Sequence, residues 1–109
     1  GKLTVDTLTT NHELILADLL NHIHTRKGER VERPEFGTSI HDMILDLPPI
    51  DAEKVVRNEL TRVVNSDPRV ELVNISVAAR EHDISAEIVV KFLEDDLTAK
   101  LVTTFIADL

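Results

Sequence analysis

The sequence predicts an α+β domain in which N-terminal helices pack on one face of a three-stranded antiparallel meander. Apolar residues recur at helical spacing in the first two thirds of the chain and alternate from residue 73 onward. Short acidic turns separate the alternating segments, as in hairpins. The 109 residues are enough for one core. We therefore expect an N-terminal arm, residues 1–10, and a single domain, residues 11–109.

A first helix is predicted from about Asn11 to Arg26. Thr10 and Glu13 have the spacing of a capping box, and Gly28 can take the left-handed conformation that ends a helix. The predicted buried stripe consists of Leu16, Leu19, Leu20 and Ile23.

A loop over residues 28–38 and a short helix over residues 39–47 follow, and Pro48 and Pro49 end that helix. A second long helix is predicted to begin at Asp51, whose side chain can cap it. Its predicted buried residues are Val55, Val56, Leu60, Val63 and Val64. Pro68 ends it, because the residue before a proline resists helical geometry.

Three alternating segments predict the strands, and each gives one inward-facing set. The expected sets are Val73, Ile75, Val77 and Ala79; then Ile84, Ala86, Ile88, Val90 and Phe92; then Leu97, Ala99, Leu101, Thr103 and Phe105.

The last strand is expected at a sheet edge, with Lys100, Val102, Thr104 and Ile106 on its outer face. Only Lys100 guards this edge with a charge, and natural edges usually carry more protection. The pattern allows two interpretations: a partner adds a strand here, or a chain end of the protein already covers the edge.

Composition excludes several classes of function. The chain has no Cys, which rules out disulfides, thiolate metal sites and cysteine nucleophiles. A net charge of −8 with 3% aromatic residues disfavours binding to nucleic acid or to anionic membranes. With no apolar run long enough to cross a bilayer and no signal peptide, we expect a chain made in the cytoplasm.

Candidate catalytic and metal sites are weak. The five histidines have no metal-ligand spacing and are expected to face solvent or a helix dipole; they are His12, His22, His24, His41 and His82. Glu29, Glu32 and Glu35 lie among arginines, which lower the pKa of a carboxyl and so disfavour a general acid. We expect no catalytic residues, no metal and no cofactor.

Two short motifs stand out. The loop carries Arg26, Lys27, Gly28, Arg30, Pro34, Phe36 and Gly37. Phe36 is one of only three aromatic residues, so we expect it to fix the loop to the body, with Gly37 allowing the turn behind it. Asp67, Pro68 and Arg69 join the second long helix to the first strand, and Pro68 holds the two charges in defined directions.

These motifs resemble the baseplate wedge and sheath-initiator family of contractile-tailed phages, which includes a baseplate component of type VI secretion systems. The family pattern is a helix, a T-R-x-G-x-R-x-x-x-P-x-F-G loop, a helical pair, an E-P-R tripeptide and a β-meander. The resemblance runs from about Asn11 to Phe105. The chain departs from the pattern at residue 67, where Asp replaces Glu.

The resemblance implies a structural virion protein in the tail baseplate, assembled in the host cytoplasm. Six copies would contact wedge proteins, inner baseplate or tube proteins, and the sheath protein. Wedge docking would use Asp67, Pro68 and Arg69 with the loop residues, and the sheet would offer the sheath a template. Two other functions stay open: a regulatory adaptor on the same fold, and a glycoside hydrolase, since the family has also been called tail lysozyme.

Overall fold

The computed structural model describes residues 2–3, 8–25, 37–38, 40, 47–80 and 83–106. The elements, in chain order, are β1 (Lys2–Leu3), α1 (Thr10–His24), α3 (Pro49–Asn65), β2 (Val70–Ala79), β3 (Asp83–Phe92) and β4 (Thr98–Ile106). The expected short helix over residues 39–47 falls largely outside the described residues.

The three long strands form the predicted antiparallel meander, and the sheet order is β1-β4-β3-β2. The two-residue strand β1 was not predicted and pairs antiparallel with β4. In the described part of the chain, β3 is thus central, β2 is one edge, and β1 covers part of the other.

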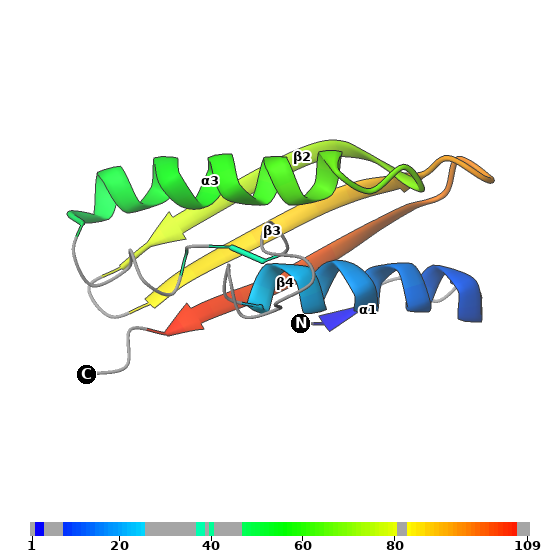
Figure 1. Ribbon diagram of the computed structural model, residues 1–109, viewed down its shortest axis with the longest axis horizontal. Helices are drawn as coiled ribbons and strands as arrows, with labels where there is room; N and C mark the ends of the chain where they lie inside the picture. Colours follow the sequence, from blue (N-terminus) through cyan, green and yellow to red (C-terminus); the bar gives the residue numbers. More distant parts are fainter. Residues whose placement is uncertain are drawn as a thin grey trace.

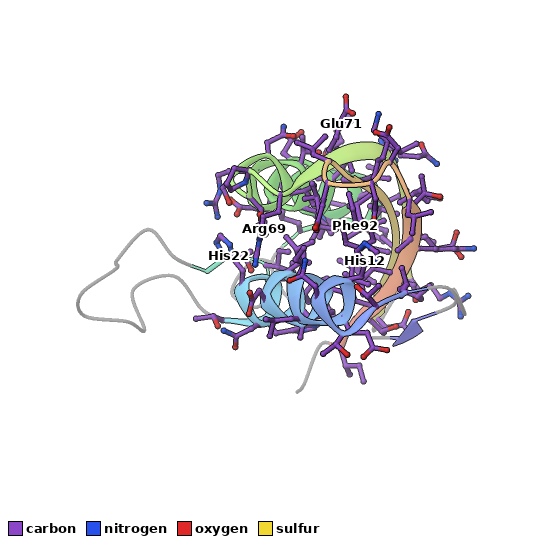
Figure 2. All side chains as sticks on the ribbon, turned by 90° about the vertical axis from the view of Figure 1, so that its right-hand side faces the viewer. His12, His22, Arg69, Glu71 and Phe92 are labelled. Carbon is purple, nitrogen blue, oxygen red and sulfur yellow. The ribbon has the colours of Figure 1, made fainter. Side chains whose placement is uncertain are left out.

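Both helices cover the same face of the sheet, as predicted, and Figure 1 shows them side by side over the strands. The whole inward set predicted for β3 is buried: Ile84, Ala86, Ile88, Val90 and Phe92 are at most 2% exposed. The core residues of α1 and α3 pack against this set. The opposite face of the sheet carries ion pairs such as Lys91 with Glu71 (3.1 Å), and no described helix covers it (Figure 2).

Both helices begin earlier than predicted. Thr9, rather than Thr10, caps α1, and His12, rather than Glu13, completes the capping box. The shift by one residue allows the His12 ring to cap the helix and be buried at once. Helix α3 begins at Pro49, so Asp51 lies in its first turn and does not cap it. Proline suits this position because it lacks the N–H that would be unpaired there.

The inward sets of the outer strands each contain one wrong residue. The register of β2 and β3 passes from Leu72 opposite Val90 to Asn74 opposite Val89, so Val73 is the extra residue of a β-bulge. Val73 is consequently 55% exposed. Leu97 belongs to the turn before β4 and is also exposed.

Because of the bulge, Val73 is exposed and Val77 of the same strand is buried. Replacing each by Ala compares their contributions to the free energy of unfolding. Val77→Ala removes a side chain that is 6% exposed, and we expect it to lower the free energy of unfolding by about 1.5–3 kcal/mol. Val73→Ala should change it by no more than about 0.5 kcal/mol. Urea unfolding measures both values, and equal losses would contradict the bulge at Val73.

Candidate functional site

The connector between α3 and β2, residues 66–69, is built by hydrogen bonds that close the helix. Ser66 Oγ donates to the Val63 carbonyl (2.6 Å), and the Asp67 N–H donates to the Val64 carbonyl (3.1 Å). Pro68 then turns the chain toward β2. The connector therefore leaves the helix in one fixed direction.

Asp67 and Arg69 bind each other across this turn. Asp67 Oδ1 accepts from the backbone N–H of Arg69 and from its Nε, both at 2.9 Å, and Oδ2 accepts from Nη2 at 2.7 Å. The backbone bond is an Asx turn, which a short carboxylate makes easily. The two side-chain bonds form a bidentate pair with defined geometry.

This pairing shifts the pKa of both groups. Hydrogen bonds from the Arg69 side chain lower the pKa of Asp67, while partial burial opposes them. Hydrogen bonds to the Asp67 carboxylate raise the pKa of Arg69. The Asp67 side chain is only 12% exposed, against 42% for Arg69, so the guanidinium is the part of the pair that solvent reaches.

Three segments distant in sequence meet at Arg69. Its Nη1 donates to Asp18 Oδ2 of α1 (3.2 Å), and its carbonyl accepts from the Leu93 N–H in the turn between β3 and β4 (3.0 Å). That turn also contacts α1, because Asn11 Nδ2 donates to Glu94 Oε2 (3.1 Å). Three of the five N–H donors of the Arg69 guanidinium are used in these contacts, and within the described residues two remain available.

Two exposed leucines accompany Arg69. Leu14 lies on α1 between Asn11 and Asp18 and is 58% exposed; Leu93 is 52% exposed. We name the surface made by Leu14, Asp18, Asp67, Pro68, Arg69 and Leu93 the connector surface. Sequence reasoning missed Leu14, Asp18 and Leu93. Only Leu14 left a signal, as an apolar residue outside the predicted stripe of its helix.

His12 corrects the expectation of solvent-facing histidines. Its side chain is 1% exposed, and its Nδ1 accepts from the Thr9 N–H (3.1 Å). The ring therefore carries its proton on Nε2, which bonds Asp95 Oδ2 (2.7 Å), and it lies 4.2 Å from the Phe92 ring centroid. Figure 2 shows His12 and Phe92 next to each other between α1 and the sheet.

His24 fixes the other end of α1. Its Nε2 is 2.6 Å from Thr103 Oγ1 on β4, and its ring centroid lies 5.0 Å from that of Phe105. His22 is half-buried, and its charge contributes to lowering the pKa of Asp67. His41 and His82 lie outside the described residues.

Most of the loop predicted to dock with the connector lies outside the described residues: Arg26, Lys27, Gly28, Arg30, Pro34 and Phe36, with the three glutamates of the loop. Gly37 is described and has a φ of 108°, which confirms the need for glycine there. Arg62 Nη2 of α3 donates to its carbonyl (2.6 Å), and the Thr38 N–H donates to the Thr25 carbonyl (2.8 Å). Both ends of segment 26–36 thus meet at the C-terminal end of α1.

The predicted edge on β4 is partly covered. Lys2 of β1 stands opposite Val102 and Leu3 opposite Leu101. A segment of the same chain therefore covers the edge at these two residues, in line with the interpretation that the protein covers its own edge. Lys100 pairs with Glu87 of β3 (3.2 Å), Thr104 is exposed, and Ile106 is 69% exposed.

The described residues contain no group of three or more His, Cys, Asp or Glu side chains that could hold a metal ion. Over the same residues, no helix combines the length and apolar character needed to cross a membrane.

Comparison with known proteins gives consistent matches. A family model described as baseplate wedge protein gp25 matches residues 9–103. Baseplate wedge protein gp25 of Enterobacteria phage T4 is 33% identical over 75 residues, which are 68% of this chain and 57% of the phage protein. The chain thus spans a little over half the length of that relative.

A solved structure shares the fold over nearly the whole chain. It is a protein of Geobacter sulfurreducens described as a candidate tail lysozyme, with a TM-score of 0.81 and 25% sequence identity. The superposition covers 96% of this chain and 98% of the other.

The Asp67–Arg69 pair predicts a pH-dependent contribution to stability. The pKa of Asp67 is lower in the folded protein than the value of about 3.9 in an unfolded chain. Its ionised form therefore stabilises the fold above the unfolded pKa, and this contribution is lost as the pH falls through the folded pKa. We expect Asp67→Asn to cost about 1 kcal/mol at pH 7 and less at pH 3, which lies below the unfolded pKa.

Urea unfolding at both pH values measures this difference. Asp96→Asn is the matched control: Asp96 is highly exposed, and its positive φ of 62° suits Asn equally well. A loss for Asp67→Asn that does not depend on pH would contradict the stabilising pair.

Proposed function

The chain belongs to the baseplate wedge protein family, and we propose that it docks on the wedge through the connector surface and starts the sheath at the edge of β4. Family membership gives the chain a structural role in a phage tail baseplate. The family model and the phage relative are both described as wedge proteins, so the proposed role is structural and not enzymatic.

The observation that carries the docking proposal is the fixed position of Arg69. Its guanidinium is held by Asp67 and Asp18, and among the described residues two of its N–H donors have no acceptor and are available to a partner. Leu14 and Leu93 add exposed apolar surface on the two segments that contact Arg69. A partner that offers a hydrogen-bond acceptor beside apolar side chains would fit this surface, as expected of a protein docked on its neighbour.

The loop over residues 26–36 is proposed to extend this contact. Its two ends meet at the C-terminal end of α1. His22 lies about half a turn before His24, the last residue of that helix, and Asp18 lies under two turns before it. The proposed docking residues of the loop, from Arg26 to Gly37, would then reach the same partner as the connector surface.

We expect Arg69→Ala to weaken binding to the wedge proteins of the same particle roughly ten- to hundredfold, because a charged hydrogen-bond partner is worth about 1.5–3 kcal/mol. Arg57→Ala is the matched control, since it removes an exposed arginine of α3 that lies outside the connector surface. Its effect on affinity should be much smaller.

Isothermal titration with the purified wedge proteins measures these affinities, and circular dichroism checks that each variant is folded. Wild-type affinity in a folded Arg69→Ala protein would contradict docking through this surface.

The proposed sheath contact is strand pairing. Outside residues 101 and 102, the edge of β4 has no strand partner in the described part of the chain. A strand added there would gain backbone hydrogen bonds for affinity, and its alternating side chains would set the register. The exposed Ile106 and Thr104 lie on this strand.

Two double lysine variants, one on β4 and one on β2, test which edge of the sheet pairs with the sheath strand. We expect Thr104→Lys with Ile106→Lys to slow sheath addition several-fold, because charged edge residues oppose strand pairing. Ser76→Lys with Ala78→Lys places the same two charges on exposed positions of β2 and should leave sheath addition unchanged. Light scattering with purified sheath protein follows the growth; equal growth on both variants would contradict pairing at β4.

Copy number would strengthen these contacts. In the proposed arrangement six copies surround the tail tube in the inner baseplate of the virion, after assembly in the host cytoplasm. Six linked sites bind with avidity, so each contact can be weak alone. Six copies bound together would then stay attached to the sheath when the sheath contracts and releases its stored strain.

A further inference from the structure

The middle of the β4 edge is occupied by the backbone of the same chain. Strand β1 pairs antiparallel with β4, with Lys2 opposite Val102 and Leu3 opposite Leu101. Strand β4 extends from Thr98 to Ile106, so among the described residues β1 covers two of its nine residues. Figure 1 shows β1 as a short arrow near the N-terminus, in contrast to the long ribbon of β4.

We infer that β1 is a placeholder strand, which occupies the edge of β4 until a longer strand of a partner displaces it. The inference rests on the proposed addition of a sheath strand to β4. An edge strand has one row of backbone donors and acceptors. A partner strand that follows β4 from residue 98 to residue 106 needs those of residues 101 and 102, which β1 uses.

The lengths of the two strands favour displacement. Two paired residues make few hydrogen bonds, and each contributes little net free energy after the exchange with water. Holding them in place also costs backbone entropy. A strand that follows all of β4 makes several times as many hydrogen bonds with the same edge. Displacement by a longer strand is therefore favourable, whereas water alone leaves β1 in place.

The opposite edge has a different protection. In β2 the bulge at Val73 interrupts the ladder, and bulges are a known means of discouraging strand addition. Strand β4 pairs with β3 in unbroken register from Asp83–Ile106 to Lys91–Thr98. The unbroken edge of β4 is thus the one that β1 covers. This cover would prevent pairing between copies of the free protein, and a partner strand could still displace it.

A pair of double variants tests the placeholder. Lys2→Pro with Leu3→Pro removes both backbone donors of β1, so it breaks the pairing whichever residue donates. Lys2→Ala with Leu3→Ala keeps the donors and is the matched control. Of the Leu101 and Val102 amides, one faces β1 and the other faces β3, because successive residues of a strand bond to opposite sides.

The hydrogen-exchange rates of the Leu101 and Val102 amides report the pairing of β1 with β4 in the isolated protein. In the proline variant we expect faster exchange at the amide that faces β1 and unchanged exchange at the other. With purified sheath protein as the probe, the same variant should bind about three- to tenfold faster than wild type, because a larger fraction of molecules has an open edge. The alanine variant should match wild type in both measurements.

Two results would overturn the placeholder. Equal sheath binding by all three proteins, together with slower binding by the Thr104→Lys, Ile106→Lys variant, would show that β1 does not compete and would leave the proposed function intact. Sheath binding by none of the three, although exchange shows the edge opened, would reject strand addition and the placeholder together.

Discussion

The architecture depends on burying one face of β3. This strand is paired on both sides, and its inward residues, from Ile84 to Phe92, are at most 2% exposed. Both helices are needed to cover that face, so they lie side by side on it. The opposite face of the sheet carries ion pairs such as Lys91 with Glu71. The outer strands β2 and β4 add residues to the core and also provide the sheet edges, where an assembly protein can meet its neighbours.

Polar contacts join α1 to the connector and to the turn between β3 and β4. His12 bonds Asp95 in a buried position, Asn11 bonds Glu94, and Asp18 bonds Arg69. All three contacts start from the N-terminal two thirds of α1 and end on segments more than 50 residues away in sequence. The helix, the connector and the turn between β3 and β4 therefore hold one another, and the connector surface is rigid because each segment is fixed by the other two.

Sequence periodicity was sufficient for β3 and for most of each helix stripe, because burial on one regular face imposes a regular pattern. It was wrong for Leu20 and Val55, which are only partly buried, and it missed the buried Ile15 and Ala52. It was wrong at Val73, where the bulge changes the phase and alternation in the sequence gives no sign of it. It also missed the role of His12. The buried His12 ring, whose Nδ1 caps the helix, is held by a hydrogen bond to Asp95 and by packing beside Phe92. These two residues are distant in sequence, so the contacts leave no local pattern. The two-residue β1 is too short to produce a period.

Sequence reasoning identified Asp67, Pro68 and Arg69 of the connector surface, but it missed the other three residues and the geometry of all six. The sequence shows Asp67, Pro68 and Arg69 as charges beside a proline, and the structure shows that the two charges bind each other. The family pattern has Glu at residue 67; the shorter Asp reaches the N–H two residues on and forms an Asx turn while it holds the guanidinium. An arginine side chain loses about 2 kcal/mol of rotamer entropy when it is fixed. Here folding has already fixed it, so a partner that binds Arg69 meets a side chain that needs little further ordering.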